Sequence, residues 1–227
     1  MSIAPAPLTD ERRRLLQRRV RWIVTATILY NLVEAVVAIA AGAAASSAAL
    51  IGFGLDSTIE VLSAAAVAWQ FTRRDPERWE KGTLRVIAIA FFALAAYVTV
   101  TSVLALVLQV DVAHSTVGIV IAALSVAIMP FLSLAERRAG RELGSATAVA
   151  DSKQTLICTY LSASVLAGLL LNSLLGWWWA DAVAALVIAG FAVREGLEAW
   201  RGDACATPVG MLLEDEHHDG HDHDHDH

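Results

Sequence analysis

Acidic residues recur at helical spacing inside apolar stretches of this chain. One stretch carries Asn31 and Glu34, three residues apart, and the next carries Asp56 and Glu60, four residues apart. Residues at these spacings share one face of an α-helix, so each pair forms a polar patch. Placing a carboxylate at the centre of a bilayer costs at least about 2.5–3.5 kcal/mol of free energy, so such groups need a neighbouring charge or hydrogen-bond partner, or a function that retains them.

A third apolar stretch carries polar residues on one helical face. These are Asp151, Gln154, Cys158 and Ser162, at intervals of three, four and four. Thiolate, amide oxygen and carboxylate together favour a borderline transition-metal ion over calcium or magnesium, which prefer oxygen alone. A bound metal ion would relieve the repulsion among the buried acids, and protonation of the acids would relieve it equally well. Competition between metal and protons would therefore couple their movements.

Six apolar stretches position these residues. The chain has 227 residues, of which 56% are hydrophobic and 18% charged, with a mean hydropathy of +0.55. Each stretch is close to the roughly 20 residues that cross a bilayer as a helix, and none alternates as a barrel strand does. The predicted fold is all-α, a polytopic membrane protein with six transmembrane helices. The stretches cover about residues 22–43, 48–71, 85–108, 115–135, 147–172 and 178–198.

The distribution of lysine and arginine predicts the orientation of the six helices. The N-terminal segment, the second and fourth connections and the end of the last stretch are basic, whereas the other three connections contain no lysine or arginine. Positive charge stays on the cytosolic side, so we expect a multi-pass protein of the cell membrane with both termini in the cytosol. Without its acidic last residues, 214–227, the chain is nearly neutral, so it lacks the basic face that nucleic-acid binding requires.

Three regions follow from this pattern. Residues 1–21 are predicted as a cytosolic basic arm with a short amphipathic helix at the membrane surface. Residues 22–200 are predicted as the six-helix transmembrane domain. Residues 201–227 are predicted as a cytosolic tail rich in histidine and aspartate, which is too polar to fold.

Depth along the predicted helices brings the polar residues to two levels. At about 1.5 Å per residue, Asp56 lies roughly 12 Å and Glu60 roughly 18 Å below the outer boundary. On the same scale, Gln154 lies about 10 Å and Cys158 about 16 Å from the inner boundary. In a core about 30 Å thick, Asp56 is level with Cys158 and Glu60 with Gln154. Glu34 falls between the two levels.

These levels predict a metal site near the midplane. Asp56, Glu60 and Cys158 are its predicted direct ligands. Gln154 and Glu34 are predicted as additional ligands or as proton acceptors.

Asp151 is predicted to lie near the cytosolic mouth of the site.

The polar groups also have a structural interpretation that involves no metal ion. Asn, Gln, Ser and protonated Glu also form hydrogen bonds between membrane helices without any ion, and for Asn31 and Ser162 this structural role is an equal alternative.

The last residues of the chain alternate histidine with aspartate. Such a tract can bind Zn, Ni or Co loosely. The alternative interpretations are a solvated tail and an added remnant. The predicted tail ligands are His217, His218, His221, His223, His225 and His227.

Three segments resemble the cation diffusion facilitator family. Residues 47–63 look like the family's second helix, in which an Ala-Leu lead-in is followed by an [HD]xxxD motif and then by Leu-Ser. Residues 150–162 resemble its fifth helix, which is again built on [HD]xxxD. Residues 176–189 resemble the beginning of its sixth helix. The resemblance implies a homodimeric exporter of divalent transition metals (Zn, Fe, Co, Ni, Mn or Cd), driven by proton antiport at a four-ligand site between helices two and five.

The chain departs from the family pattern at the site. Glu60 stands where the second-helix motif has Asp, and Gln154 and Cys158 replace both motif residues of the fifth helix. The family's zinc selectivity is therefore not carried over. We expect a divergent member without the family's cytosolic α/β domain.

No enzyme activity is expected, because the chain has no His-Glu-x-x-His, no serine elbow and no Gly-rich phosphate loop. A non-transporting membrane protein that binds metal as an accessory or sensor is the alternative function, and a passive channel is a further one.

Overall fold

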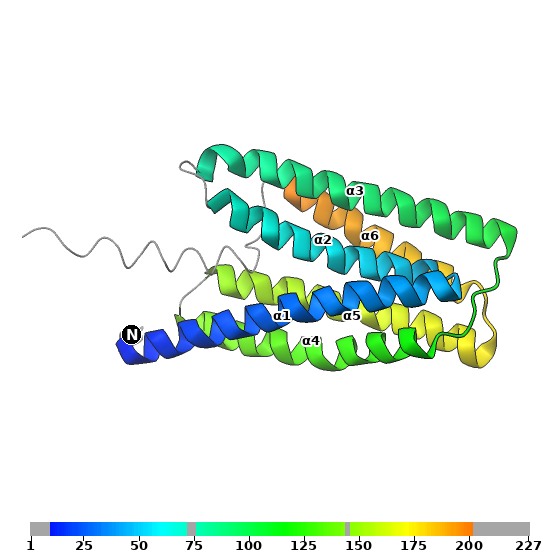
Figure 1. Cartoon of the computed structure of the whole chain (residues 1–227), viewed down its shortest axis with the longest axis horizontal. Helices are drawn as coiled ribbons and strands as arrows, with labels where there is room; N and C mark the ends of the chain where they lie inside the picture. Colours follow the sequence, from blue (N-terminus) through cyan, green and yellow to red (C-terminus); the bar gives the residue numbers. More distant parts are fainter. Residues whose placement is uncertain (1–9, 72–75, 144–145, 202–227) are drawn as a thin grey trace, which may run out of the picture.

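The computed structural model describes residues 10–71, 76–143 and 146–201, and within these ranges the side chains of all but residues 10, 13, 67–71, 76–80, 146–151, 153 and 154. The described residues form six α-helices and no strand (Figure 1). The predicted all-α class is confirmed. The helices are α1 (Asp10–Ala45), α2 (Ala48–Phe71), α3 (Pro76–Leu108), α4 (Thr116–Leu143), α5 (Ala146–Leu175) and α6 (Ala180–Arg201).

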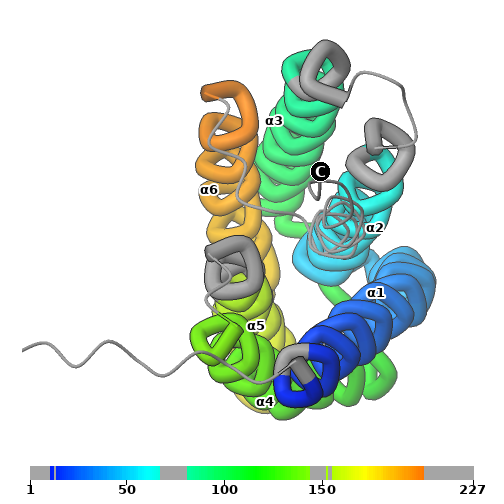
Figure 2. Tube along the Cα trace, turned by 90° about the vertical axis from the view of Figure 1, so that its left-hand side faces the viewer, coloured from blue at the N-terminus to red at the C-terminus, as the bar shows by residue number. Residues whose placement is uncertain are grey.

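The six helices form one bundle in which α2 is central. Successive helices run in opposite directions along the long axis (Figure 1). α2 packs against α1, α3, α5 and α6, whereas α4 packs mainly on α5 and α1, and α3 packs on α6 (Figure 2). The helix that carries Asp56 and Glu60 therefore contacts most of the bundle.

Five of the helices are long and apolar enough to cross a membrane, which identifies a polytopic membrane protein. Their outward faces carry exposed aliphatic side chains such as Val36, Val100 and Val107, which suits a surface covered by lipid. α6 is the exception, because it holds Asp181 in its first turn and several charges near its end. Its transmembrane span stays a prediction.

Residues 10–21, the described part of the predicted basic arm, are helical and continue directly into the first apolar stretch. α1 is continuous over 36 residues, because no Gly or Pro interrupts residues 10–41 and Arg, Leu and Gln favour helix. Leu16, Val20 and Val24 are buried and form a small core with Ala139 of α4. Residues 10–21 of the predicted arm are thus an extension of the first helix that packs along α4.

The tight turn between α1 and α2 is held from α6. Ser46 has φ of 57°, and Ser47 caps α2 by accepting a hydrogen bond from Leu50 N at 3.0 Å. Buried Asp181 accepts a hydrogen bond from Ser47 Oγ at 2.5 Å and another from Ala49 N at 3.3 Å. The carboxylate of α6 thereby satisfies the free donors at the start of α2.

α1 and α2 approach closely because α2 has glycine at the contact. A Cβ atom built on Gly54 would lie 2.7 Å from Ile39 Cγ1, 2.9 Å from Ile39 N and 3.0 Å from Ala35 O. Two of these three atoms belong to the backbone of α1, which cannot move aside. Gly54 therefore sets the distance at which side chains of α1 meet those of α2.

We expect Gly54→Ala to push α1 from α2 and to lower thermal stability, with a loss of about 1–3 kcal/mol typical of overpacking. Gly190→Ala is the matched control, since nothing lies within 4 Å of a Cβ there. The measurement is the thermal unfolding midpoint of both proteins in detergent, followed by tryptophan fluorescence. Equal midpoints would show that this contact does not fix the helix spacing.

Candidate metal centre

Glu60 of α2 is the point at which side chains from three helices meet. Cys158 Sγ of α5 donates a hydrogen bond to Glu60 Oε1 at 2.8 Å. Asn31 Nδ2 of α1 donates to the other carboxylate oxygen, Glu60 Oε2, at 2.7 Å. Cys158 and Asn31 are 8% and 6% exposed. A carboxylate, a thiol and an amide thus converge inside the bundle.

Asn31 has an unused acceptor at this point. Its Oδ1 atom is buried and has no hydrogen-bond partner among the described residues. A buried amide oxygen without a partner loses the solvation of that group, and an amide oxygen is also a common ligand of hard and borderline cations. The amide group therefore offers an oxygen next to the Glu60 carboxylate.

Asp56 is buried one helical turn from Glu60 on the same face of α2. Charges on Glu60, Glu195 and Glu34 are close enough to repel a charge on Asp56. Within the part of the chain whose side chains are described, no three His, Cys, Asp or Glu side chains are grouped closely enough to hold one ion. Asp56 therefore belongs to an acidic region around Glu60, but the described side chains do not gather Asp56, Glu60 and Cys158 into one three-ligand group.

Glu34 of α1 is held by hydroxyl groups from two other helices. Ser57 Oγ of α2 donates to Glu34 Oε2 at 2.8 Å, and Ser125 Oγ of α4 donates to Glu34 Oε1. Tyr30 OH lies 2.6 Å from Ser125 Oγ. Glu34 is 2% exposed, so this hydroxyl network replaces the water that a carboxylate would otherwise bind.

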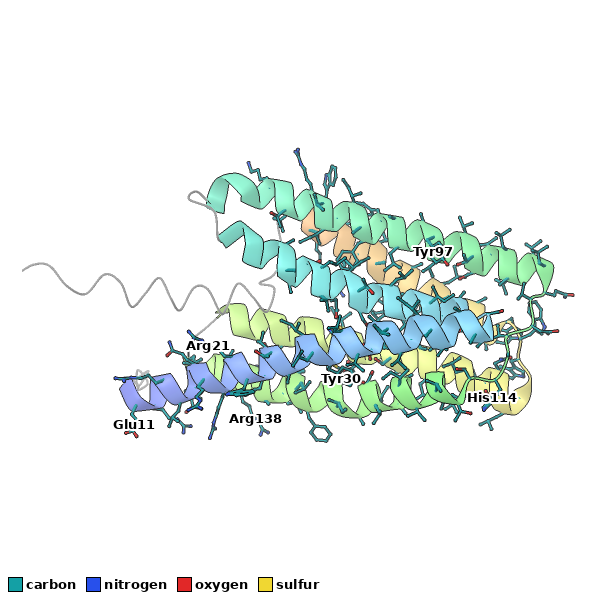
Figure 3. The ribbon with its side chains drawn as sticks, viewed as in Figure 1. Glu11, Arg21, Tyr30, Tyr97, His114 and Arg138 are labelled. Atoms are coloured by element: carbon teal, nitrogen blue, oxygen red, sulfur yellow. The ribbon has the colours of Figure 1, made fainter. Side chains whose placement is uncertain are left out.

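Glu34 follows Tyr30 by one helical turn on α1. Tyr30 lies midway along the bundle axis between Arg21 at one end and His114 at the other (Figure 3). The basic side chains of Arg21 and Arg138 lie at the same end of the bundle (Figure 3).

The structure brings some of the predicted site residues together in a different pairing. Cys158 contacts Glu60, whereas the depth estimate placed it level with Asp56. The glutamate side chain is one methylene longer than aspartate, and the helices are inclined to one another (Figure 1), so contacts do not follow depth alone. The side chains of Gln154 and Asp151 and the histidine tail lie outside the described residues.

Sequence reasoning missed the residues that hold the acids. Ser57, Ser125 and Tyr30 bind Glu34 or its partner, and each is an ordinary residue of a membrane helix. The spacing of Ser125 four residues after Ile121 gives no signal, since the hydroxyl also donates to the Ile121 carbonyl as many membrane serines do. Only the packing of α4 on α1 shows its second role.

Two comparisons with known proteins bear on this site. The family model described as the cation efflux transmembrane domain matches residues 24–201. The protein named Cation-efflux pump FieF from Shewanella oneidensis is 31% identical over 87 residues. That stretch is 38% of this chain and 29% of the pump, so the chain matches less than a third of its relative's length.

We expect Ser125→Ala to destabilise the bundle more than Ser162→Ala does. Ser125→Ala removes a donor to the buried Glu34 carboxylate from another helix, which costs about 1–3 kcal/mol. Ser162 is equally buried but donates only to the Cys158 carbonyl of its own helix. Thermal unfolding in detergent compares the two. A Ser162→Ala midpoint as low as that of Ser125→Ala would argue against the interhelical bond.

Proposed function

The chain belongs to the cation efflux family, and we propose that it exports divalent transition-metal cations from the cytosol in exchange for protons, through a midplane site between α2 and α5 that α1 completes. The family match and the long apolar helices identify a multi-pass membrane protein related to metal cation transporters. The single observation that carries the proposal is the contact of Glu60 on α2 with Cys158 on α5.

The Glu60 and Cys158 pair suits a transported cation. The thiol donates its proton toward the carboxylate, and a thiolate is the form that binds metal. A cation that enters between the sulfur and the carboxylate would therefore displace that proton. One sulfur among oxygen donors favours ions of intermediate softness such as Zn, Fe, Co, Ni or Cd over calcium and magnesium.

Asp56, Gln154 and Asn31 are proposed to supply the remaining ligands, and Asp56 would have to move closer to Glu60 and Cys158 for the three to hold one ion. Asp56 lies one turn from Glu60 on the same face, and Gln154 precedes Cys158 by one turn on α5. The free Oδ1 of Asn31 adds an oxygen from α1. Asp151, one further turn toward the basic end, is proposed to lie at the cytosolic mouth.

Glu34 is proposed to hold the proton and not the metal. Both of its oxygens accept hydrogen bonds from serine hydroxyls, which leaves them poorly placed to bind a cation with Glu60. Ser57, which binds Glu34, follows Asp56 directly on α2. A charge on Glu34 repels charges on Asp56 and Cys158. Protonation of Glu34 and binding of a cation therefore relieve the same repulsion, so each makes the other less favourable.

Two further parts of the proposal concern assembly and supply. Homodimerisation follows the family resemblance. The histidine tail, at the end of the chain that α6 directs to the basic end of the bundle, would collect cytosolic ions for the site.

Cys158→Ser tests the metal site. The assay uses proteoliposomes with a pH gradient and a metal-sensitive dye inside. We expect Cys158→Ser to reduce Cd²⁺ flux about tenfold or more and to change Mn²⁺ flux less, because Cd²⁺ prefers the sulfur ligand that is lost. Even changes outside the direct ligands of a metal site lower metal affinity or activity at least about tenfold. Cys205→Ser, which changes the second cysteine of the chain, is the control and should leave both fluxes unchanged.

An unaltered metal preference in Cys158→Ser would show that the thiol only packs. Wild-type vesicles without any metal flux, in which the histidine tail still binds metal, would favour the accessory or sensor function. Metal flux that does not depend on the pH gradient would favour a passive channel.

Glu34→Gln tests the assignment of the proton. The amide keeps the size of the carboxyl group but cannot take up a proton, so we expect metal flux that no longer accelerates when a pH gradient is imposed. Glu198→Gln, at an exposed acid of α6 that pairs with Arg194, is the control and should retain the response. If Glu34→Gln also retains it, the exchanged proton is carried by another group.

A further inference from the structure

A groove at the basic end of the bundle combines charge with apolar walls. It runs between α1 and α4, and the spacing of its residues follows one face of each helix. Its lining includes Arg18, Arg19 and Trp22 from α1 and Ala135, Arg138 and Glu142 from α4. Its floor includes the buried side chains of Leu16 and Ala139.

The positive charge of this groove is uncompensated. Glu142 is its one acid and is already bound to Arg12, whose Nε lies 2.8 Å from Glu142 Oε1. In the described part of the chain, Arg18, Arg19 and Arg138 form no ion pair with any acid. Guanidinium groups are the donors that bind phosphate best, because their fork of N–H groups matches two oxygens.

Helix lengths place these arginines at the level of lipid headgroups. α1 is about 54 Å long at 1.5 Å per residue, well beyond the roughly 30 Å of the hydrocarbon core. Counting roughly 20 residues back from Ala45 on α1 reaches Ala26, and counting the same number forward from Thr116 on α4 reaches Ala135. Arg138 and Arg18 then lie one and two turns beyond the hydrocarbon boundary.

Ala135 lies at the hydrocarbon boundary and Trp22 lies one turn outside it. Trp22, 66% exposed, follows one turn after Arg18 and Arg19 toward the membrane. Tryptophan is enriched at this depth, where its ring lies among headgroups. Exposed Ala135 leaves room on the α4 side of the groove. Phosphate near the arginines and an acyl chain beside Trp22 and Ala135 would fit the groove in a single lipid orientation.

We propose that the groove between α1 and α4 is a binding site for an anionic phospholipid, whose phosphate contacts Arg18, Arg19 and Arg138 and whose acyl chain packs on Trp22 and Ala135. The charge of the groove selects an anionic headgroup, and its apolar wall at the membrane boundary selects a lipid over a free anion. The inference does not depend on the proposed transport activity.

Native mass spectrometry of the detergent-purified full chain tests the site. With phosphatidylglycerol added at low mole fraction, we expect bound lipid that phosphatidylcholine does not replace. Arg18→Gln, Arg19→Gln and Arg138→Gln combined should weaken phosphatidylglycerol binding about a hundredfold, the effect expected from three basic residues beside an anionic headgroup. The triple lysine variant at the same positions should keep most of the affinity and shows that the helices remain packed.

The matched control neutralises three arginines on the other side of the bundle, Arg85, Arg194 and Arg201. It has the same net charge as the test variant and should bind phosphatidylglycerol as the wild type does. Equal loss in the control would reduce the effect to general charge attraction and overturn the site.

Two other occupants of the groove are outcomes of the same experiment. Displacement of the lipid by millimolar inorganic phosphate would mean that the groove holds a free anion. Tighter lipid binding by a full chain with Asp222, Asp224 and Asp226 changed to Asn would mean that the acidic tail occupies the groove. Either result overturns the lipid proposal.

Discussion

Buried carboxylates are the constraint on which this bundle depends. Glu34 and Asp56 are 2% and 6% exposed, in helices that meet lipid on their outer faces. Helices in a bilayer gain little from burying apolar surface against one another, and they associate through close packing and polar contacts. The acids therefore have two effects at once. They create a cost that only neighbouring helices can offset, and the hydrogen bonds that offset it join α1 to α2, α4 and, through Glu60, α5.

The six helices could be predicted from the sequence because the bilayer requires long apolar runs that no other fold class supplies. α2 begins at Ala48 and ends at Phe71 as predicted. The start of α1, the start of α3 and the end of α4 could not be predicted in this way, because these helices continue past the hydrocarbon core into polar sequence. Arginine favours helix as well as water, so hydropathy marks where the membrane ends and not where the helix ends.

The candidate site was predictable in its residue types and only partly in its contacts. The cost of burial singled out Glu34, Asp56 and Glu60, and the helical spacing of α5 singled out Cys158. The partner of Cys158 depends on the tilt and separation of α2 and α5, which a linear depth estimate does not contain. The role of Ser125 could not be predicted, because a serine that bonds its own helix and one that also bonds a neighbour have the same sequence signature.

In the proposed exchange, the contacts of α1 with α2 would connect the proton to the cation. On its α2 side, Gly54 brings the two backbones together, and such a contact changes little with protonation. On the same side Glu34 and Asn31 bind Ser57 and Glu60, and these bonds depend on charge. A neutral Glu34 accepts hydrogen bonds more weakly than a carboxylate, and a cation at Glu60 competes with Asn31 Nδ2 for the same oxygen. In the proposed exchange, proton and cation would therefore act on bonds of one helix pair whose spacing glycine holds constant, which would allow the pair to rearrange its polar contacts without separating.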